Sequence, residues 1–175
     1  PEFLTKVANS GCTVFIIHAR KALLRGLSPK DNRTIPPLQY PLVYEMQKNF
    51  PELDIILNGG LTDLKEMKSC VKNRVAGVMI GREAYQNPSI LLNVDNEIFD
   101  QKEKVRSMKD VIRNMIEYCN REKAEGTAIK GILKHLKGAF KGRANSKEFK
   151  RVLFCNETTD SEKLERLSNL VPIYC

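Results

Sequence analysis

The sequence lacks the features that are typical of a membrane protein, of a secreted protein with disulfide bonds or of a zinc-binding protein. Its 175 residues contain no run of 18 or more apolar residues, and its start has neither the basic segment nor the apolar core of a signal peptide. The five cysteines are odd in number and show no CxxC spacing. This pattern predicts reduced thiols in a cytoplasmic protein and argues against zinc or a disulfide framework. An initiator Met is also absent, so we expect the chain to begin inside a longer polypeptide.

Positive charge is concentrated in one segment. The net charge is +8, and residues 130–151 alone carry eight basic side chains against one acidic side chain, Glu148. A concentrated positive field of this kind suits a polyanion such as nucleic acid. A lysine-rich face that is simply solvated would have the same composition, so charge alone leaves both interpretations open.

Three short apolar runs predict β-strands in the first half of the chain. The runs are residues 14–17, 55–57 and 75–80, and each is apolar throughout, which is typical of strands buried on both faces. The predicted strands lie near residues 14–18, 54–58 and 75–80. Helical patterns occur at residues 40–50 and 62–72. This alternation predicts parallel strands in an α/β sheet. Three strands cannot close a barrel, so the sheet is either open or completed by residues upstream.

After about residue 100 the pattern becomes helical. Helices are predicted at roughly 102–123, 128–140, 147–154 and 161–170. In the second of these, Lys130, Lys134, Lys137 and Lys141 recur at helical spacing and would lie within about 60° of one another. We therefore predict an α/β domain over residues 1–99 and an all-α domain, a small helical bundle, over residues 100–175.

Polar residues follow all three predicted strands, where α/β proteins bind their ligands. His18 ends the first strand, an Asn-Gly-Gly turn at residues 58–60 follows the second, and Gly81 and Arg82 follow the third. Glycine amides and an arginine at the start of a helix can together hold an anion. A tight turn or a structural histidine would explain each motif alone. Their occurrence at successive strand ends favours a ligand that carries a phosphate.

Two longer segments resemble the tRNA-dihydrouridine synthases, specifically the DusA-like branch. The first runs from HARKA at residues 18–22 through GLSPK and IPPL to the NGG turn, and the second is GVMIGREAYQNPSIL at residues 77–91. The resemblance extends over residues 15–99 and continues more weakly through the basic helical region. Because the motifs recur in one order, this resemblance is far more specific than any single short motif.

The resemblance implies the last three strands, six to eight, of a TIM barrel, followed by a helical tRNA-binding domain. It also implies an FMN enzyme that reduces uridine to 5,6-dihydrouridine in the D-loop of tRNA, with NADPH as reductant. The implied FMN-binding residues are His18, at the flavin, and Asn58, Gly59, Gly60, Gly81 and Arg82, at the phosphate. The implied tRNA-binding residues are Lys30 and Arg33, in the loop after HARKA, and Lys147, Lys150 and Arg151 in the helical domain. The lysine pattern adds Lys134, Lys137 and Lys141 as candidate tRNA contacts. We expect the basic residues of the helical domain to form one surface on the side of the flavin pocket's mouth.

The family's general acid has no counterpart in this sequence. In the family it is a cysteine within an Asn-x-Gly-Cys-Pro segment, and none of the five cysteines here occurs in such a segment. The upstream flavin-binding lysine and the first five strands are also missing. We therefore expect no catalytic residue in this chain, and no activity from the chain alone.

Two other functions remain open at this point. One is a non-catalytic tRNA-binding protein that keeps a vestigial half-barrel, and the other is an FMN-binding barrel with a small-molecule substrate. The basic stripe and the GLSPK loop argue against the second. Flavin binding, or an upstream Asn-x-Gly-Cys-Pro segment, would distinguish the enzyme from the first. The exposed strand edges of an incomplete barrel would favour dimerisation or aggregation.

Overall fold

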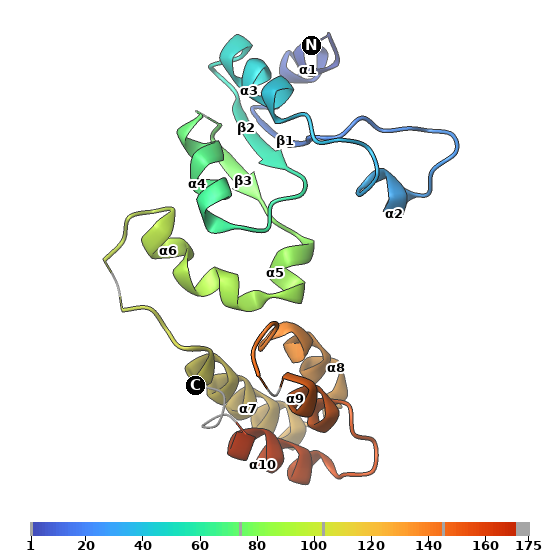
Figure 1. The fold of residues 1–175 in the computed structure, drawn as a ribbon, viewed down its shortest axis with the longest axis vertical. Helices are drawn as coiled ribbons and strands as arrows, with labels where there is room; N and C mark the ends of the chain where they lie inside the picture. The colour runs from blue at the N-terminus through green and yellow to red at the C-terminus, as the bar shows by residue number, and fades with distance from the viewer. Residues whose placement is uncertain (1, 74, 103, 145, 171–175) are drawn as a thin grey trace. The chain divides into compact units, whose positions relative to one another are not determined.

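A computed structural model describes residues 2–73, 75–102, 104–144 and 146–170 (Figure 1). The chain forms two compact units, Pro1–Gly81 and Arg82–Cys175, and each is described by itself. Within the described ranges, no helix combines the length and apolar character needed to cross a membrane.

The first unit is a parallel sheet with helices between its strands (Figure 1). The strands lie side by side in the order β1-β2-β3, and both pairings are parallel. Its elements are α1 (Glu2–Ala8), β1 (Val14–His18), α2 (Pro29–Asn32), α3 (Tyr40–Asn49), β2 (Asp54–Asn58), α4 (Leu64–Lys72) and β3 (Gly77–Met79). The three predicted strands and their parallel arrangement are confirmed, although β3 is shorter than expected.

The two faces of this sheet differ in burial. Ile55 and Leu57 of β2 are fully buried on the face that α3 and α4 cover. On the opposite face, Val14, Ile16 and Met79 are exposed, Ile16 to 56%. Because alternate residues of a strand point to opposite faces, these side chains lie on one face of the sheet, which the described helices leave exposed. The expectation of burial on both faces therefore holds for one face only.

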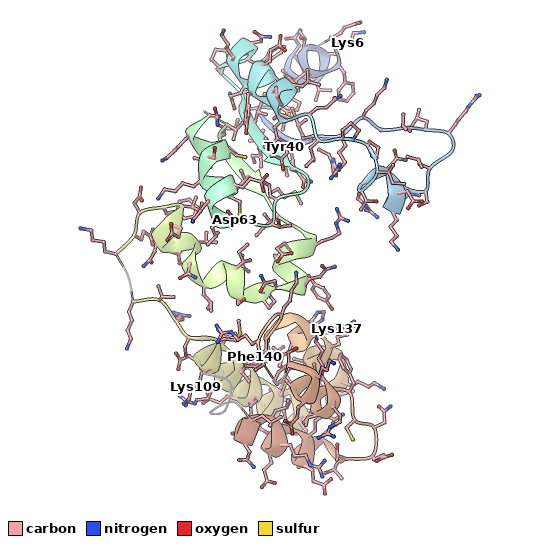
Figure 2. The ribbon with its side chains drawn as sticks, viewed as in Figure 1. Lys6, Tyr40, Asp63, Lys109, Lys137 and Phe140 are labelled. Carbon is pink, nitrogen blue, oxygen red and sulfur yellow. The ribbon has the colours of Figure 1, made fainter. Side chains whose placement is uncertain are left out.

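Two helices of the first unit, α3 and α4, begin at residues that favour a helix N-terminus. Asp63, labelled in Figure 2, accepts hydrogen bonds at Oδ1 from the amides of Lys65 and Glu66, at 2.8 and 3.1 Å. These bonds satisfy two of the amides that the first turn of α4 leaves without partners. Pro41 occupies the first turn of α3, where its missing N–H costs nothing. Both predicted helices are confirmed.

The second unit is helical. Its elements are α5 (Arg82–Gln86), the 3₁₀ segment η1 (Pro88–Asn93), α6 (Val94–Glu97), α7 (Met108–Ala124), α8 (Lys130–Leu133), the 3₁₀ segment η2 (Lys134–Gly138), α9 (Ser146–Leu153) and α10 (Asp160–Leu170). One apolar cluster joins α7 to α10, with Phe140 and Phe149 edge to face at its centre, 4.8 Å between ring centroids. Its assignment as a separate helical-bundle domain stays a prediction.

Two predicted helices differ from the structure. The first begins at Met108 rather than near 102, because Ser107 and Asp110 form a reciprocal capping box there. Residue 103, also in the predicted range, lies outside the described residues. The second, over 128–140, is not one α-helix but α8 followed by η2. Gly131 and Gly138 interrupt this stretch, and glycine weakens an α-helix interior.

The boundary between the compact units lies before the predicted domain boundary at residues 99 and 100. The reason is that α5 packs within the second unit. The Tyr85 and His135 rings meet edge to face, with centroids 5.8 Å apart. A Cβ built on Gly138 would lie 2.8 Å from the Tyr85 carbonyl oxygen, so the backbones of η2 and α5 approach closely. The division into two functional domains at residues 99 and 100 stays a prediction.

Candidate ligand site at the carboxyl end of the sheet

The strand register brings the predicted polar residues into one row. His18 is paired with Asn58, and Asn58 with Met79, at the carboxyl ends of the three strands. Residues paired across neighbouring strands point to the same face. His18, Asn58 and Met79 therefore share the face that the helices leave uncovered. In barrels built from such units, ligands bind at this end of the strands.

The turn after β2 needs glycine at both positions. Gly59 and Gly60 have φ values of +122° and +72°, a backbone region that other residues rarely adopt. A Cβ on Gly59 would lie 3.2 Å from Cε1 of His18, and one on Gly60 would lie 2.6 Å from Cδ1 of Leu38. The His18 ring thus lies against this turn. The structure brings together His18 and the NGG motif, which the sequence predicts as one site.

A tyrosine supports the same turn. The hydroxyl of Tyr40 (the residue is labelled in Figure 2), in the first turn of α3, donates to the Gly59 carbonyl at 2.6 Å. Burial, and then the nearby negative charge of Glu66, raises the pKa of Tyr40 to about 12. The hydroxyl therefore keeps its proton, and remains a donor, at any physiological pH. Sequence reasoning missed this residue, because its partner is 19 residues away and only the fold brings the two together.

The connection from β1 to α3 carries Lys30 and Arg33 and projects from the sheet (Figure 1). Its base is closed where the Gln39 amide donates to the Ala19 carbonyl at 2.8 Å and Arg20 forms an antiparallel bridge with Leu38. The Arg20 guanidinium also donates to the carbonyl of Pro36.

Farther along the same connection, the Asn32 side chain bonds to both backbone groups of Leu23, at 2.8 and 2.9 Å. Lys30 and Arg33 are exposed on a loop that these bonds hold in shape. These hydrogen bonds give the loop a defined conformation, although it has little regular secondary structure.

Of the two residues predicted to bind phosphate after β3, Gly81 belongs to the first unit and Arg82 to the second. Gly81 is exposed, and a Cβ on it would meet no described atom within 4 Å. Arg82 is the first residue of α5 and belongs to the second unit. The predicted convergence of the Gly59, Gly60, Gly81 and Arg82 amides therefore stays a prediction.

None of the cysteines in the described ranges lies at the carboxyl end of the sheet. Cys12 precedes β1, Cys70 is buried on α4, and Cys119 is buried on α7, while Cys155 follows α9. Cys175 lies outside the described residues. In the same ranges, His, Cys, Asp and Glu side chains form no group of three that could hold a metal ion.

Three basic residues of the second unit lie close to a polar or acidic side chain. Lys130 donates to Asn156 Oδ1 at 3.3 Å, Lys141 lies 3.1 Å from Glu83, and Arg151 lies 3.6 Å from Glu148. The other candidate contacts are Lys134, Lys137 and Lys147, which are exposed, and Lys150, which is half-buried.

The predicted stripe of four lysines on a single α-helix is wrong, because the helix changes to 3₁₀ geometry at Lys134. In a 3₁₀-helix, residues three apart are eclipsed. Lys134 and Lys137 therefore form a closer pair than α-helical spacing would give, and they come from a single element, η2.

Known proteins match almost the whole chain. The sequence model of one family, described as "Dihydrouridine synthase (Dus)", matches residues 1–172. A protein of Escherichia coli (strain K12) named "tRNA-dihydrouridine(20/20a) synthase" is 46% identical over 153 residues, which are 87% of this chain and 44% of that protein. A protein of the same name from Salmonella typhi is 42% identical over 174 residues, 97% of this chain and 52% of the relative. The chain thus spans about half the length of the curated relatives it matches.

Proposed function

The chain belongs to the dihydrouridine synthase family, and from that premise we propose that it is the C-terminal part of an FMN-dependent tRNA-dihydrouridine synthase. It would contribute strands six to eight of a TIM barrel and a helical tRNA-binding region. The complete enzyme would reduce uridine to 5,6-dihydrouridine in the tRNA D-loop, with NADPH as reductant. The observation that carries the proposal is the row of His18, Asn58 and the Gly59–Gly60 turn at one end of the sheet, on its uncovered face.

The residues at this end suit the phosphate of FMN. Gly59 and Gly60 form a turn in which added side chains would crowd His18 and Leu38. Neither glycine amide donates to another described residue. Free backbone amides at a strand end are suitable anion donors. Asn58, Gly59, Gly60, Gly81 and Arg82 would hold the phosphate, while His18 would contact the flavin. Bound FMN would supply the hydride-transfer chemistry.

The proposal gives the general acid for the uracil ring to residues other than the described cysteines of this chain. Among the described cysteines, none lies at the carboxyl end of the sheet. The general acid would therefore come from residues outside this chain, and the chain alone would be inactive.

The described cysteines are free, which favours a cytoplasmic location.

The basic residues would hold the tRNA. A target base must leave its stack to reach the flavin, which costs a few kcal/mol. Contacts to phosphates elsewhere on the RNA can offset that cost. Cations on an ordered loop and on helices are suited to this role. The proposed contacts are Lys30, Arg33, Lys134, Lys137, Lys141, Lys147, Lys150 and Arg151.

Flavin content and tRNA reduction test this proposal. We expect the complete protein to retain FMN and to form dihydrouridine in tRNA, and the 175-residue chain to form none. Arg82→Ala in the complete protein should weaken FMN binding by about 1.5–3 kcal/mol, because charge-assisted hydrogen bonds contribute about that much. A complete protein that binds tRNA but holds no flavin would instead support the non-catalytic tRNA-binding alternative.

A further inference from the structure

Tyr40 and Gly59 form a contact that fixes one peptide plane of the proposed phosphate turn. The Tyr40 hydroxyl donates to the Gly59 carbonyl at 2.6 Å. The bond between Gly59 and Gly60 is a trans peptide, in which the C=O of one residue and the N–H of the next point in opposite directions. With the carbonyl held toward Tyr40, the Gly60 amide must point away from α3.

A turn of two glycines needs such a constraint. Glycine has wide conformational freedom, so the two peptide planes can rotate unless something outside the turn fixes them. Here Leu38 packs against Gly60 from one side, and Tyr40 holds the Gly59 carbonyl. The Gly60 amide itself donates to no other described residue, so the fixed plane presents an available donor.

We propose that Tyr40 is a positioning residue for the phosphate site: by holding the Gly59 carbonyl, its hydroxyl orients the Gly60 amide toward the phosphate of the flavin. The inference rests on the proposed function, since FMN is the ligand whose phosphate would be held. Tyr40 itself need not touch the ligand.

Riboflavin provides a readout that a general packing role would not move, because it is FMN without its phosphate. If Tyr40 acts through the turn, the Tyr40→Phe change should weaken binding of FMN and leave binding of riboflavin unchanged. The loss of one neutral hydrogen bond predicts a decrease in FMN affinity of about threefold to tenfold. If Tyr40 only packs α3 against the sheet, both affinities should fall together.

Tyr44 offers a matched control. It lies one turn further along α3 and donates to the Cys70 sulfur at 3.3 Å, away from the glycine turn. Tyr44→Phe removes the same atom from the same helix, and we expect it to change neither affinity. The measurement is a fluorescence titration of the complete apoprotein with FMN and with riboflavin, for the wild type and both variants.

The outcomes separate this inference from the proposal beneath it. A selective loss of FMN affinity in Tyr40→Phe, with Tyr44→Phe unchanged, supports the inference. An unchanged FMN affinity, or an equal loss for both flavins, overturns it while the proposed function stands. A wild-type protein that binds FMN no better than riboflavin overturns the proposed function and this inference with it.

Discussion

The Lys141 ammonium lies 3.1 Å from the carboxylate of Glu83, whose side chain is only 10% exposed. This pair joins the segment after η2 to α5 within the second unit. Removing Lys141 would leave a carboxylate poorly solvated and without that cation. Lys141 therefore has a role in the fold, and loss of tRNA binding in a Lys141 variant would not identify an RNA contact. Lys134 and Lys137 are exposed on η2 and give a cleaner test.

Replacing Lys134 and Lys137 together by Ala should weaken tRNA binding and reduce its dependence on salt. Each lysine that contacts a phosphate releases about one counterion, so the slope of log affinity against log salt should flatten by roughly two units. The Michaelis constant for tRNA should rise, while flavin content stays intact. Filter-binding titrations at several salt concentrations measure the slope.

Lys109 and Lys123 on α7 provide the control for this variant (Lys109 and Lys137 are labelled in Figure 2). The Lys109→Ala and Lys123→Ala pair removes the same charge from another helix of the same unit. We expect its salt slope to match that of the wild type. A wild-type slope in the η2 variant would show that Lys134 and Lys137 are only solvated cations. An equal change in both variants would indicate a general effect of net charge.

Gly138→Ala should destabilise the second unit. A Cβ at this position would lie 2.6 Å from the Gln86 carbonyl carbon and 2.8 Å from the Tyr85 carbonyl oxygen, and this backbone cannot move aside as a flexible side chain can. Overpacking of this kind costs about 1–3 kcal/mol. Gly131→Ala on α8 is the matched control, because a Cβ there meets no described atom within 4 Å. It should be neutral or slightly stabilising. Urea unfolding of the two variants tests the close approach, which equal stabilities would contradict.

The strands and most of the helices could be predicted because their signals are local. Short apolar runs predicted the positions of β1 and β2, and helical periodicity over residues 62–72 predicted α4. The row formed by His18 and Asn58 was also accessible, because parallel strands place their carboxyl ends together.

The features that sequence reasoning missed depend on contacts between distant residues. The hydrogen bond between Tyr40 and Gly59 forms because α3 packs beside β2, and no local sequence pattern around Tyr40 predicts it. Gly138 at the end of η2 lies close to the backbone of α5, a contact between distant residues that periodicity does not register. Periodicity alone treated residues 128–140 as one α-helix and so aligned four lysines that the structure does not align.

The start of α7 should depend on pH through Asp110. The Ser107 hydroxyl and then the Ser107 amide donate to its carboxylate, and they lower the pKa of Asp110. A group whose folded-state pKa is lowered stabilises the fold above its ordinary pKa and loses that contribution as pH falls through the folded value. Ser107→Ala should raise the Asp110 pKa toward the ordinary carboxylate range, as measured by NMR titration. The pKa of Glu162, which Thr159 lowers in a similar way, should not change. An unaltered Asp110 pKa would contradict the capping-box explanation.

The uncovered face of the sheet gives the sharpest test of the barrel proposal. Ile16 is 56% exposed on that face, whereas Leu57 is fully buried on the other. In the 175-residue chain, Leu57→Ala should lower the free energy of unfolding by about 2–5 kcal/mol, as expected for a core residue. Ile16→Ala should cost less than about 1 kcal/mol, since little of its surface is removed from water on folding.

In the complete protein the two costs should become similar. If five further strands close the barrel, Ile16 becomes an interior residue, and Ile16→Ala should then cost about 2–5 kcal/mol as well. Leu57→Ala serves as the internal control, because α3 and α4 already cover its face and its cost should not depend on the rest of the barrel. Urea unfolding of both variants in both polypeptides measures the four values. A cost for Ile16→Ala that stays small in the complete protein would mean that this face is never buried, and an interior role for His18 and Asn58 on the same face would fail with it.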